Sequence, residues 1–160
     1  MTNLFYYLTF AAALGSGLLA GIFFAFSTFV MTALSRLPAG QSIYAMQSIN
    51  DVIVKSSFIV VFMGTTALCL ILGIVSCARF GTAGAGYVLA GCLCIIVGAF
   101  LVTAIFNVPL NNELATITPG SSDAAGVWGR YIAGWMPWNH VRTMASIAAL
   151  VLFVIALRKY

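Results

Sequence analysis

The residues with the clearest potential for chemistry stand together in the last third of the sequence. Asn139, His140 and Arg142 open a long apolar run. Histidine accepts a proton near neutral pH, so His140 is a candidate general base. An arginine inside an apolar run is costly to bury, which makes Arg142 a candidate for holding an anionic oxygen. Two structural alternatives stay open: a hydrogen-bonded His140, and an Arg142 side chain that extends towards water.

Amide side chains form a second group of candidates. Asn107 and Asn111 have a spacing that places both on one face of a helix, and Asn112 follows directly. Gln47 and Asn50 come from an earlier, more polar stretch. An amide in apolar surroundings needs a hydrogen-bond partner, and it can donate to a carbonyl or oxyanion of a ligand. The sequence leaves open whether these amides bind a ligand or join helices.

An aromatic stripe precedes the C-terminal apolar run. Trp128, Tyr131 and Trp135 recur at helical spacing, and Trp138 follows. Such a stripe is typical of an aromatic belt at a membrane interface. It is equally suited to the wall of a pocket that takes a flat ligand. Arg130 lies off the stripe, where a contact with lipid headgroups is the simplest expectation.

The motifs of cofactor-dependent chemistry are missing from the sequence. It has no phosphate-binding loop, no dinucleotide fingerprint, no serine elbow and no zinc-protease motif. A single histidine without a carboxylate cluster does not form the usual metal site. The four cysteines fall in or beside apolar runs, where we expect buried small apolar residues. We therefore expect neither a metal nor a bound cofactor.

The composition indicates the environment that positions these residues. Of the 160 residues, 62% are hydrophobic and 6% are charged, whereas a soluble domain carries roughly 25% charged residues. The chain is therefore predicted to be an integral membrane protein with a single domain spanning residues 1–160. Its net charge of +4 comes from scattered cations at expected helix ends. We expect the lipid bilayer as its partner and no nucleic acid.

Four apolar runs predict four transmembrane helices, because a crossing needs about 20 residues. The fold class is all-α, an integral membrane four-helix bundle. The first run lacks the basic start of a signal peptide and is too long for one, so it is taken as a retained helix. Pro109 is expected to end the third helix. The predicted spans are residues 4–34, 57–78, 87–108 and 139–157.

Two longer connections lie on the side of the bundle opposite the termini. Residues 39–56 are predicted to form an interfacial helix after the first span. The connection between the third and fourth spans is predicted to be an amphipathic cap folded over their ends, with Asp123 as a helix N-cap. Asp51 and Lys55 have the spacing of a helical ion pair. Glu113 is a possible partner of either Arg142 or Arg130, and the sequence does not decide between them.

The distribution of Lys and Arg bears on orientation. Arg79, Arg158 and Lys159 are on the side of the termini, whereas Arg36 and Lys55 are on the other side once Arg130 and Arg142 are set apart as site residues. Cytoplasmic loops carry more Lys and Arg. We therefore expect cytoplasmic termini in a bacterial inner membrane.

Several segments together resemble the DUF1772 family of small membrane proteins, also called anthrone oxygenase-like. The resemblance covers essentially the whole chain, and its last two segments are the most specific. The segments are residues 21–27 (GIFFAFS), 46–50 (MQSIN), 107–112 (NVPLNN) and 128–143 (WGRYIAGWMPWNHVRT). The chain is most similar to the bacterial members. The resemblance implies a four-helix membrane fold. Characterised fungal members oxygenate an anthrone to an anthraquinone without a metal or flavin.

Such chemistry needs a base, groups that hold an oxyanion, and a flat apolar slot. His140 is then the expected base. The expected substrate-binding residues are Asn107, Asn111, Asn112, Asn139, Gln47 and Asn50, with Arg142 at the oxyanion and Trp128, Tyr131, Trp135 and Trp138 in the slot. The alternative is an accessory protein without activity that binds a quinone or lipid, as a homo-oligomer or within a larger membrane complex. A purely structural bundle is the third possibility.

Overall fold

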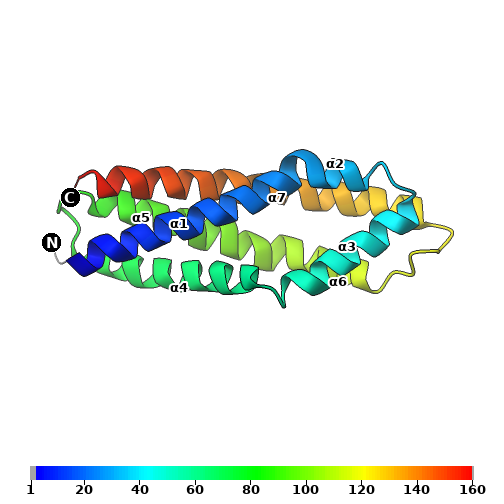
Figure 1. Cartoon of the computed structure of the whole chain (residues 1–160), viewed down its shortest axis with the longest axis horizontal. Helices are drawn as coiled ribbons and strands as arrows, with labels where there is room; N and C mark the ends of the chain where they lie inside the picture. Colours follow the sequence, from blue (N-terminus) through cyan, green and yellow to red (C-terminus); the bar gives the residue numbers. More distant parts are fainter. Residues whose placement is uncertain (1–2, 160) are drawn as a thin grey trace.

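The computed structural model describes residues 3–159, and within them the chain is built from helices and turns. Four helical stretches are long and apolar enough to cross a membrane, and they run side by side along the molecule (Figure 1). This confirms the predicted all-α integral membrane protein. Both ends of the chain lie at one end of the bundle (Figure 1). The stretches are Leu4–Leu34, Ser57–Ala78, Ala85–Ala115 and Ala124–Leu157.

The first stretch changes its helical pitch near its end. Helix α1 (Asn3–Ala25) passes into a π-helical segment, η1 (Phe26–Val30), and then into α2 (Met31–Leu34). A π-helical turn is wider than an α-helical turn and often marks a functional region. The predicted residue range 4–34 agrees with this element.

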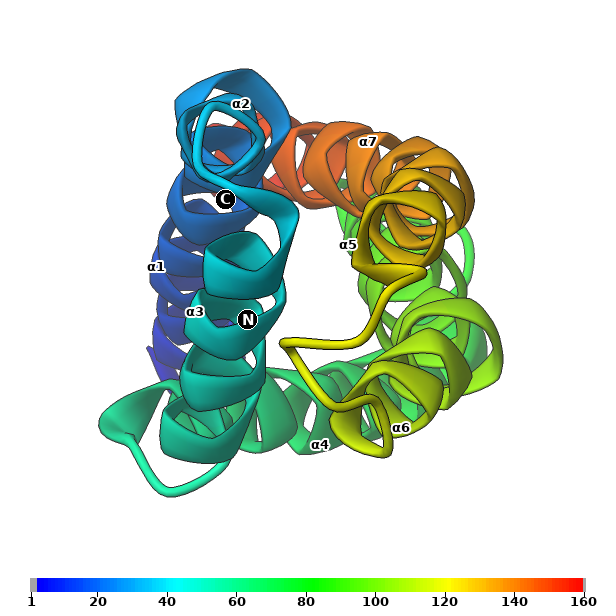
Figure 2. The same ribbon diagram turned by 90° about the vertical axis from the view of Figure 1, so that its right-hand side faces the viewer.

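Helix α3 (Ala39–Ile53) is the predicted helix after the first span. Pro38 precedes it, and the Ser42 hydroxyl donates to the Leu34 carbonyl at 2.7 Å, which fixes the turn between α2 and α3. A short turn then leads into α4 (Ser57–Ala78), where Ser56 accepts a hydrogen bond from the Phe58 amide at 3.2 Å. Helix α3 forms one side of the bundle at the end away from the termini (Figure 2), where it contacts α6 and α7.

The third stretch is longer than predicted. It runs from α5 (Ala85–Leu93) through η2 (Cys94–Leu101) and η3 (Thr103–Asn107) into α6 (Val108–Ala115). The expectation that Pro109 ends this helix is wrong. Proline lacks an N–H group, but it is tolerated in the first turn of a helix, and the π-helical turn before it already breaks the α-helical hydrogen-bond pattern.

The fourth stretch is a single helix, whereas the sequence predicted a cap segment followed by a separate membrane span. Helix α7 (Ala124–Leu157) is continuous through Pro137, so the predicted cap segment is the first part of the helix that forms the fourth span. The aromatic stripe explains this continuity, because Trp128 and Trp135 are buried against neighbouring helices and hold the first part of α7 in place. Asp123 is the N-cap residue, as predicted, but its side chain makes no capping hydrogen bond.

Glycines allow the helices to approach closely at several positions. Gly17 and Gly21 form a G-x-x-x-G spacing, but a Cβ atom on Gly21 would meet nothing within 4 Å. A Cβ on Gly91 would lie 2.7 Å from the Phe153 ring, and one on Gly98 would collide with Ala145. Close contacts at glycine therefore join α5 and η2 to α7, and Gly15 of α1 lies against Thr65 of α4.

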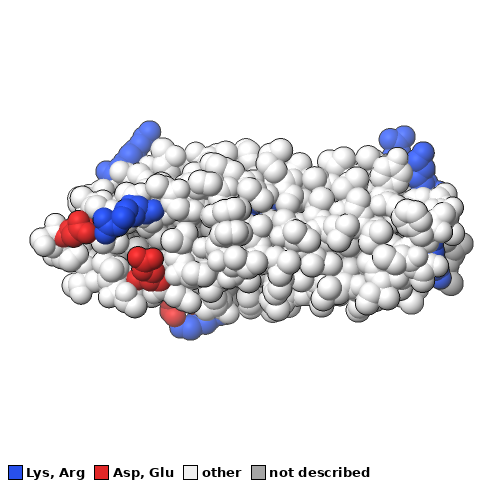
Figure 3. Space-filling model, turned by 180° about the vertical axis from the view of Figure 1, so that it is seen from behind, with Lys and Arg blue, Asp and Glu red and all other residues white. Residues whose placement is uncertain are grey.

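Charged side chains gather at the two ends of the molecule, and the broad middle of the face in Figure 3 is almost free of them. Two exposed ion pairs lie at the end away from the termini. Lys55 pairs with Asp51 at 2.6 Å, as the spacing suggested, and Arg130 pairs with Asp123 at 3.1 Å. An apolar girdle between two charged ends is the pattern that a bilayer requires.

Candidate functional site

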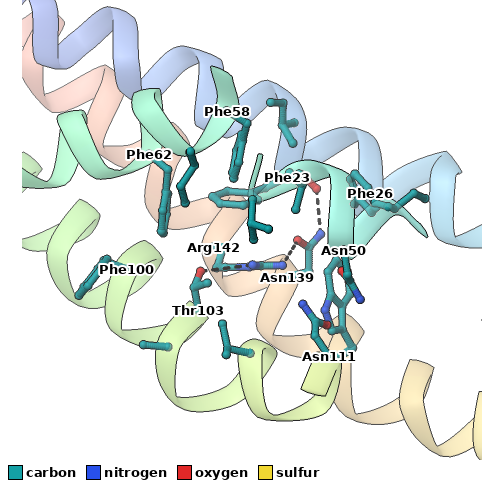
Figure 4. A pocket seen from close by; sticks show the side chains of 18 of the residues that line it. Phe23, Phe26, Asn50, Phe58, Phe62, Phe100, Thr103, Asn111, Asn139 and Arg142 are labelled. Carbon is teal, nitrogen blue, oxygen red and sulfur yellow. Dashed lines mark hydrogen bonds between the residues drawn. The ribbon is translucent and has the colours of Figure 1, made fainter. Parts of the chain in front are cut away.

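A cavity of about 280 Å³ lies between the α3–α4 junction, η3 and the middle of α7. This volume is close to the lower limit of small-molecule pockets, which is roughly 300 Å³. Most of its wall is aromatic or aliphatic, and Figure 4 shows several phenylalanines around a small polar group. The polar residues that line it are Asn50, Thr103, Asn111, Asn139 and Arg142.

Arg142 occupies the centre of this polar group and is only 6% exposed. Its guanidinium donates to Asn139 Oδ1 at 2.7 Å and to Thr103 Oγ1 at 3.2 Å (Figure 4). The guanidinium carbon also lies 4.5 Å from the Phe23 ring centroid and 4.9 Å from that of Trp135. Both distances fall within the range of cation–π attraction, about 6 Å.

The charge of Arg142 has no carboxylate partner among the described residues, whose ion pairs are both at the surface. Its Nε atom is buried and makes no hydrogen bond there. Glu113, one of the partners considered from the sequence, forms no ion pair with Arg142 or Arg130. A buried cation is normally paired, because desolvation is costly. The mostly apolar wall of the cavity therefore carries a positive charge without a carboxylate partner, and one nitrogen of that group has no hydrogen bond.

Asn139 fixes the orientation of Arg142. Its amide nitrogen donates to the Phe23 carbonyl at 2.8 Å and to Ser27 Oγ at 2.7 Å. Both amide hydrogens are thus directed at the first helical stretch, and the amide oxygen is left to accept from Arg142. The Ser27 hydroxyl also lies 3.0 Å from that of Thr143. This network joins α7 to the point where α1 becomes π-helical.

Asn50 and Asn111 add amides from two other elements. Asn111, in α6, accepts a hydrogen bond from the Tyr131 hydroxyl at 2.8 Å. Asn50, in α3, has a buried Nδ2 without a partner among the described residues. Both side chains lie on the same side of the cavity, away from Phe62 and Phe100 (Figure 4). A second free donor therefore comes from a helix distant in sequence from Arg142.

Five of the predicted site residues line the cavity, and seven do not. His140 is exposed, because neighbouring residues on a helix point in different directions and Asn139 points inwards. The structure therefore does not bring the expected base to Arg142. Asn112 is also exposed. The Gln47 side-chain amide donates to the carbonyls of Leu114 and Ile117 at 2.8 and 2.9 Å. It thus provides hydrogen bonds to backbone carbonyls at the C-terminal end of α6.

The remaining aromatic and amide candidates pack beside the cavity. Trp135 lines it, whereas Trp128 and Tyr131 stack in a row behind it with ring centroids 5.6 Å apart. The Trp138 ring stacks on the Phe106 ring, and the two ring centroids are 3.5 Å apart. Asn107 is fully buried and donates to the Trp135 carbonyl at 3.2 Å, so it joins the third and fourth stretches.

Several lining residues were not among the sequence-based candidates. Thr103 has a spacing signal, since it precedes Asn107 by one helical turn on the same face. The phenylalanines carried no such signal, because the chain has 12 of them and pattern alone does not separate lipid-facing rings from cavity-facing rings. The rings that line the cavity are Phe23, Phe26, Phe58, Phe62 and Phe100.

Fold and site together define an integral membrane four-helix protein with a buried arginine in an apolar cavity. The family model described as anthrone oxygenase matches residues 57–152. The chain belongs to this family, as the resemblance suggested. Neither a curated protein nor a solved structure matches the chain. The matched region includes Thr103, Asn111 and Arg142, whereas α1 and α3 lie outside it.

The described residues contain no group of three or more histidine, cysteine, aspartate or glutamate side chains that could hold a metal ion. The donors that line the cavity are instead amides, a hydroxyl and a guanidinium. Such groups bind anionic or carbonyl oxygens.

Proposed function

We propose that this protein is a membrane-embedded oxygenase that acts on a lipophilic, anthrone-like aromatic compound without a cofactor. The unpaired guanidinium of Arg142 in an apolar cavity carries this proposal. A ligand that develops negative charge on one oxygen would supply the missing partner. Family membership supports the same class of substrate.

The chemistry of an anthrone suits such a site. Loss of a proton from its methylene carbon gives an anion whose charge rests largely on the oxygen of the former carbonyl group. Arg142 would stabilise that oxygen, and Asn139 and Thr103 hold the guanidinium in place. The anion reacts with O2. In the overall reaction the methylene becomes a carbonyl, one oxygen atom enters the product, and the other leaves as water with the two methylene hydrogens. Four electrons pass from carbon to O2.

The proton acceptor in this proposal is water, not a side chain. Neither an imidazole nor a carboxylate is among the described residues that line the cavity. Arg142 would act by making the bound anthrone more acidic, because its charge favours the anion. His140 is therefore left out of the proposed reaction.

A binding role without turnover is the second candidate. A quinone carries carbonyl oxygens that accept hydrogen bonds, and the free donors of Arg142 and Asn50 would suit them. The lack of a side-chain base at the cavity favours this alternative. The protein would then serve as an accessory subunit, alone or as a homo-oligomer, in a larger membrane complex.

The two candidates are separated by turnover of the purified protein in nanodiscs. Anthrone is added in air, and O2 uptake and anthraquinone formation are followed. We expect Arg142→Gln to lower the rate by about 10²–10³-fold, as loss of an oxyanion donor does. Arg130→Gln is the matched control, since Arg130 is exposed and paired at the surface.

Arg142→Lys is included because it keeps the charge, and thermal unfolding of each variant reports whether it folds. Tight binding of anthraquinone without turnover by the wild type would favour the accessory role. An unchanged rate in a folded Arg142→Gln protein would contradict the assignment of Arg142.

A further inference from the structure

The cavity of Arg142 reaches the outside of the bundle through an apolar opening. Three of its lining residues are large apolar side chains with high exposure: Val54 at 57%, Met63 at 47% and Val108 at 40%. Ala104, also exposed, lines the cavity beside them. We call these four residues the rim.

The rim lies where α4 and the third helical stretch separate. Deeper in the bundle the two pack together, since the rings of Phe62 and Phe100 are 6.0 Å apart. Helix α3 ends at Ile53, and the turn that begins at Val54 leads into α4 at Ser57. Rim residues therefore come from this turn, α4, η3 and α6.

The position of the rim along the bundle places it close to one membrane surface. The exposed Asp51–Lys55 ion pair adjoins Val54, whereas Met63 and Ala104 lie within two of the membrane-spanning stretches. The opening thus faces lipid on one side and approaches the headgroup region on the other. An opening rimmed by apolar side chains does not favour a charged ligand from water.

We propose that the rim is a lateral entry site through which an uncharged, flat aromatic ligand passes from the bilayer into the cavity of Arg142. This inference rests on the proposed function for its ligand, but it adds the route and the form in which the ligand arrives. The ligand dissolves in lipid as the neutral molecule and meets a cation and free donors only inside. Charge then develops in the cavity, not on entry.

Another hollow lies on the far side of α3 and provides the internal comparison. It shares Phe26 and Phe58 with the cavity, and Val52, 59% exposed, lines only the hollow. Polar Ser48 and Ser56 also line it. Entry there would predict that a bulky residue at Val52 slows binding, whereas entry at the rim predicts no effect.

The test measures binding rates in phosphatidylcholine nanodiscs by stopped flow, with dihydroxyanthraquinone as the probe and its visible absorbance as the signal. Met63→Trp and Val108→Trp narrow the rim from opposite sides. Val60→Trp is the matched control, since Val60 is on α4, is 71% exposed and does not line the cavity. Val52→Trp tests the other hollow.

We expect the rim variants to lower the association and dissociation rate constants together by about tenfold, the low end of the variation seen among variants of one binding site. Their ratio, the Kd, should change little. A gate affects both directions equally, whereas Arg142→Gln should raise the Kd. Val60→Trp and Val52→Trp should bind at the wild-type rate.

Wild-type rates in both rim variants, or slowing by Val52→Trp alone, would overturn the rim as the entry site and leave the cavity assignment intact. Failure of the wild-type protein to bind the probe would instead count against the proposed function and, with it, the entry site. Thermal unfolding of the two rim variants, which change different helices, separates slow entry from loss of the fold.

Discussion

Arg142 is held by groups that carry no opposite charge. Asn139 and Thr103 accept its hydrogen bonds, and the rings of Phe23 and Trp135 lie near its guanidinium. These contacts orient the cation without neutralising it. A carboxylate in place of either acceptor would satisfy the charge and remove the reason for an anionic ligand to bind. Under the proposed function, the described cavity wall leaves this charge for an anionic oxygen of the ligand.

A prediction at this scale concerns the Thr103 hydroxyl. Thr103→Val removes the acceptor of one Arg142 hydrogen bond while keeping the shape of the side chain. We expect a loss of stability of about 1.5–3 kcal/mol, typical of a hydrogen bond to a charged group. Thr103→Ser keeps the hydroxyl and should therefore retain most of the wild-type stability. Thermal and denaturant unfolding in detergent would measure the change.

Thr66→Val is the control for this substitution. The Thr66 hydroxyl is buried but bonds only the Phe62 carbonyl in its own helix, at 2.8 Å. Its loss leaves no charged donor without a partner. Equal destabilisation by Thr66→Val and Thr103→Val would show that the Arg142 contact contributes nothing specific.

At the scale of elements, the π-helical segments and the close helix contacts shape the cavity. Segment η1 begins at Phe26, beside the docking point of Asn139, and η3 carries Thr103. A wider turn changes the direction of side chains that follow it. Gly98, in η2, lies about one helical turn from the cavity. Because it has no side chain, α7 can approach the third helical stretch closely there.

The contact at Gly98 gives the second stability prediction. A methyl group there would collide with the Ala145 side chain. We expect Gly98→Ala to destabilise the protein by about 1–3 kcal/mol through overpacking. Gly64→Ala is the control, because nothing lies within 4 Å of a Cβ at that position. It should be neutral or stabilising, since alanine favours helix by about 1 kcal/mol. A Gly98→Ala protein as stable as Gly64→Ala would contradict this packing.

At the scale of the whole molecule, both ends of the chain lie on one side of the bundle (Figure 1). Arg130 is exposed and forms a surface ion pair, so it counts as a charge on the opposite side. The numbers of Lys and Arg residues on the two sides are then closer than the sequence suggested, because of the two residues set apart only Arg142 is buried in the cavity. Three cations then lie on each side, so the number of Lys and Arg residues by itself favours neither orientation.

We expect the chain to insert with cytoplasmic termini, and the even balance makes this sensitive to few charges. A fluorescent protein fused after Tyr160 in bacterial cells should therefore be fluorescent. Changing Arg158 and Lys159 to glutamine should move part of the tail to the outside, detected with an alkaline phosphatase fusion. A wild-type tail found only outside the cell would contradict the expected orientation.

The sequence alone determined the solvent and the number of crossings, because both depend on composition and the lengths of apolar runs. It also singled out Arg142 and Asn139, since a cation or an amide in an apolar run stands out wherever it points. It did not determine where the helices end. Pro109 was expected to end the third helix, but the helix continues beyond it after a π-helical turn. The expected cap segment is continuous with the fourth span, because Trp128 and Trp135 pack against neighbouring helices.

Only the tertiary structure decided which candidates meet. His140 and Asn139 are adjacent in sequence, but one is exposed and the other is buried against Phe23. Asn50 and the cavity phenylalanines come from helices far apart in the chain, and their convergence depends on how those helices pack. Periodicity assigns a residue to a face of its own helix, whereas the neighbour of that face is set by long-range packing, to which a single sequence gives no direct access.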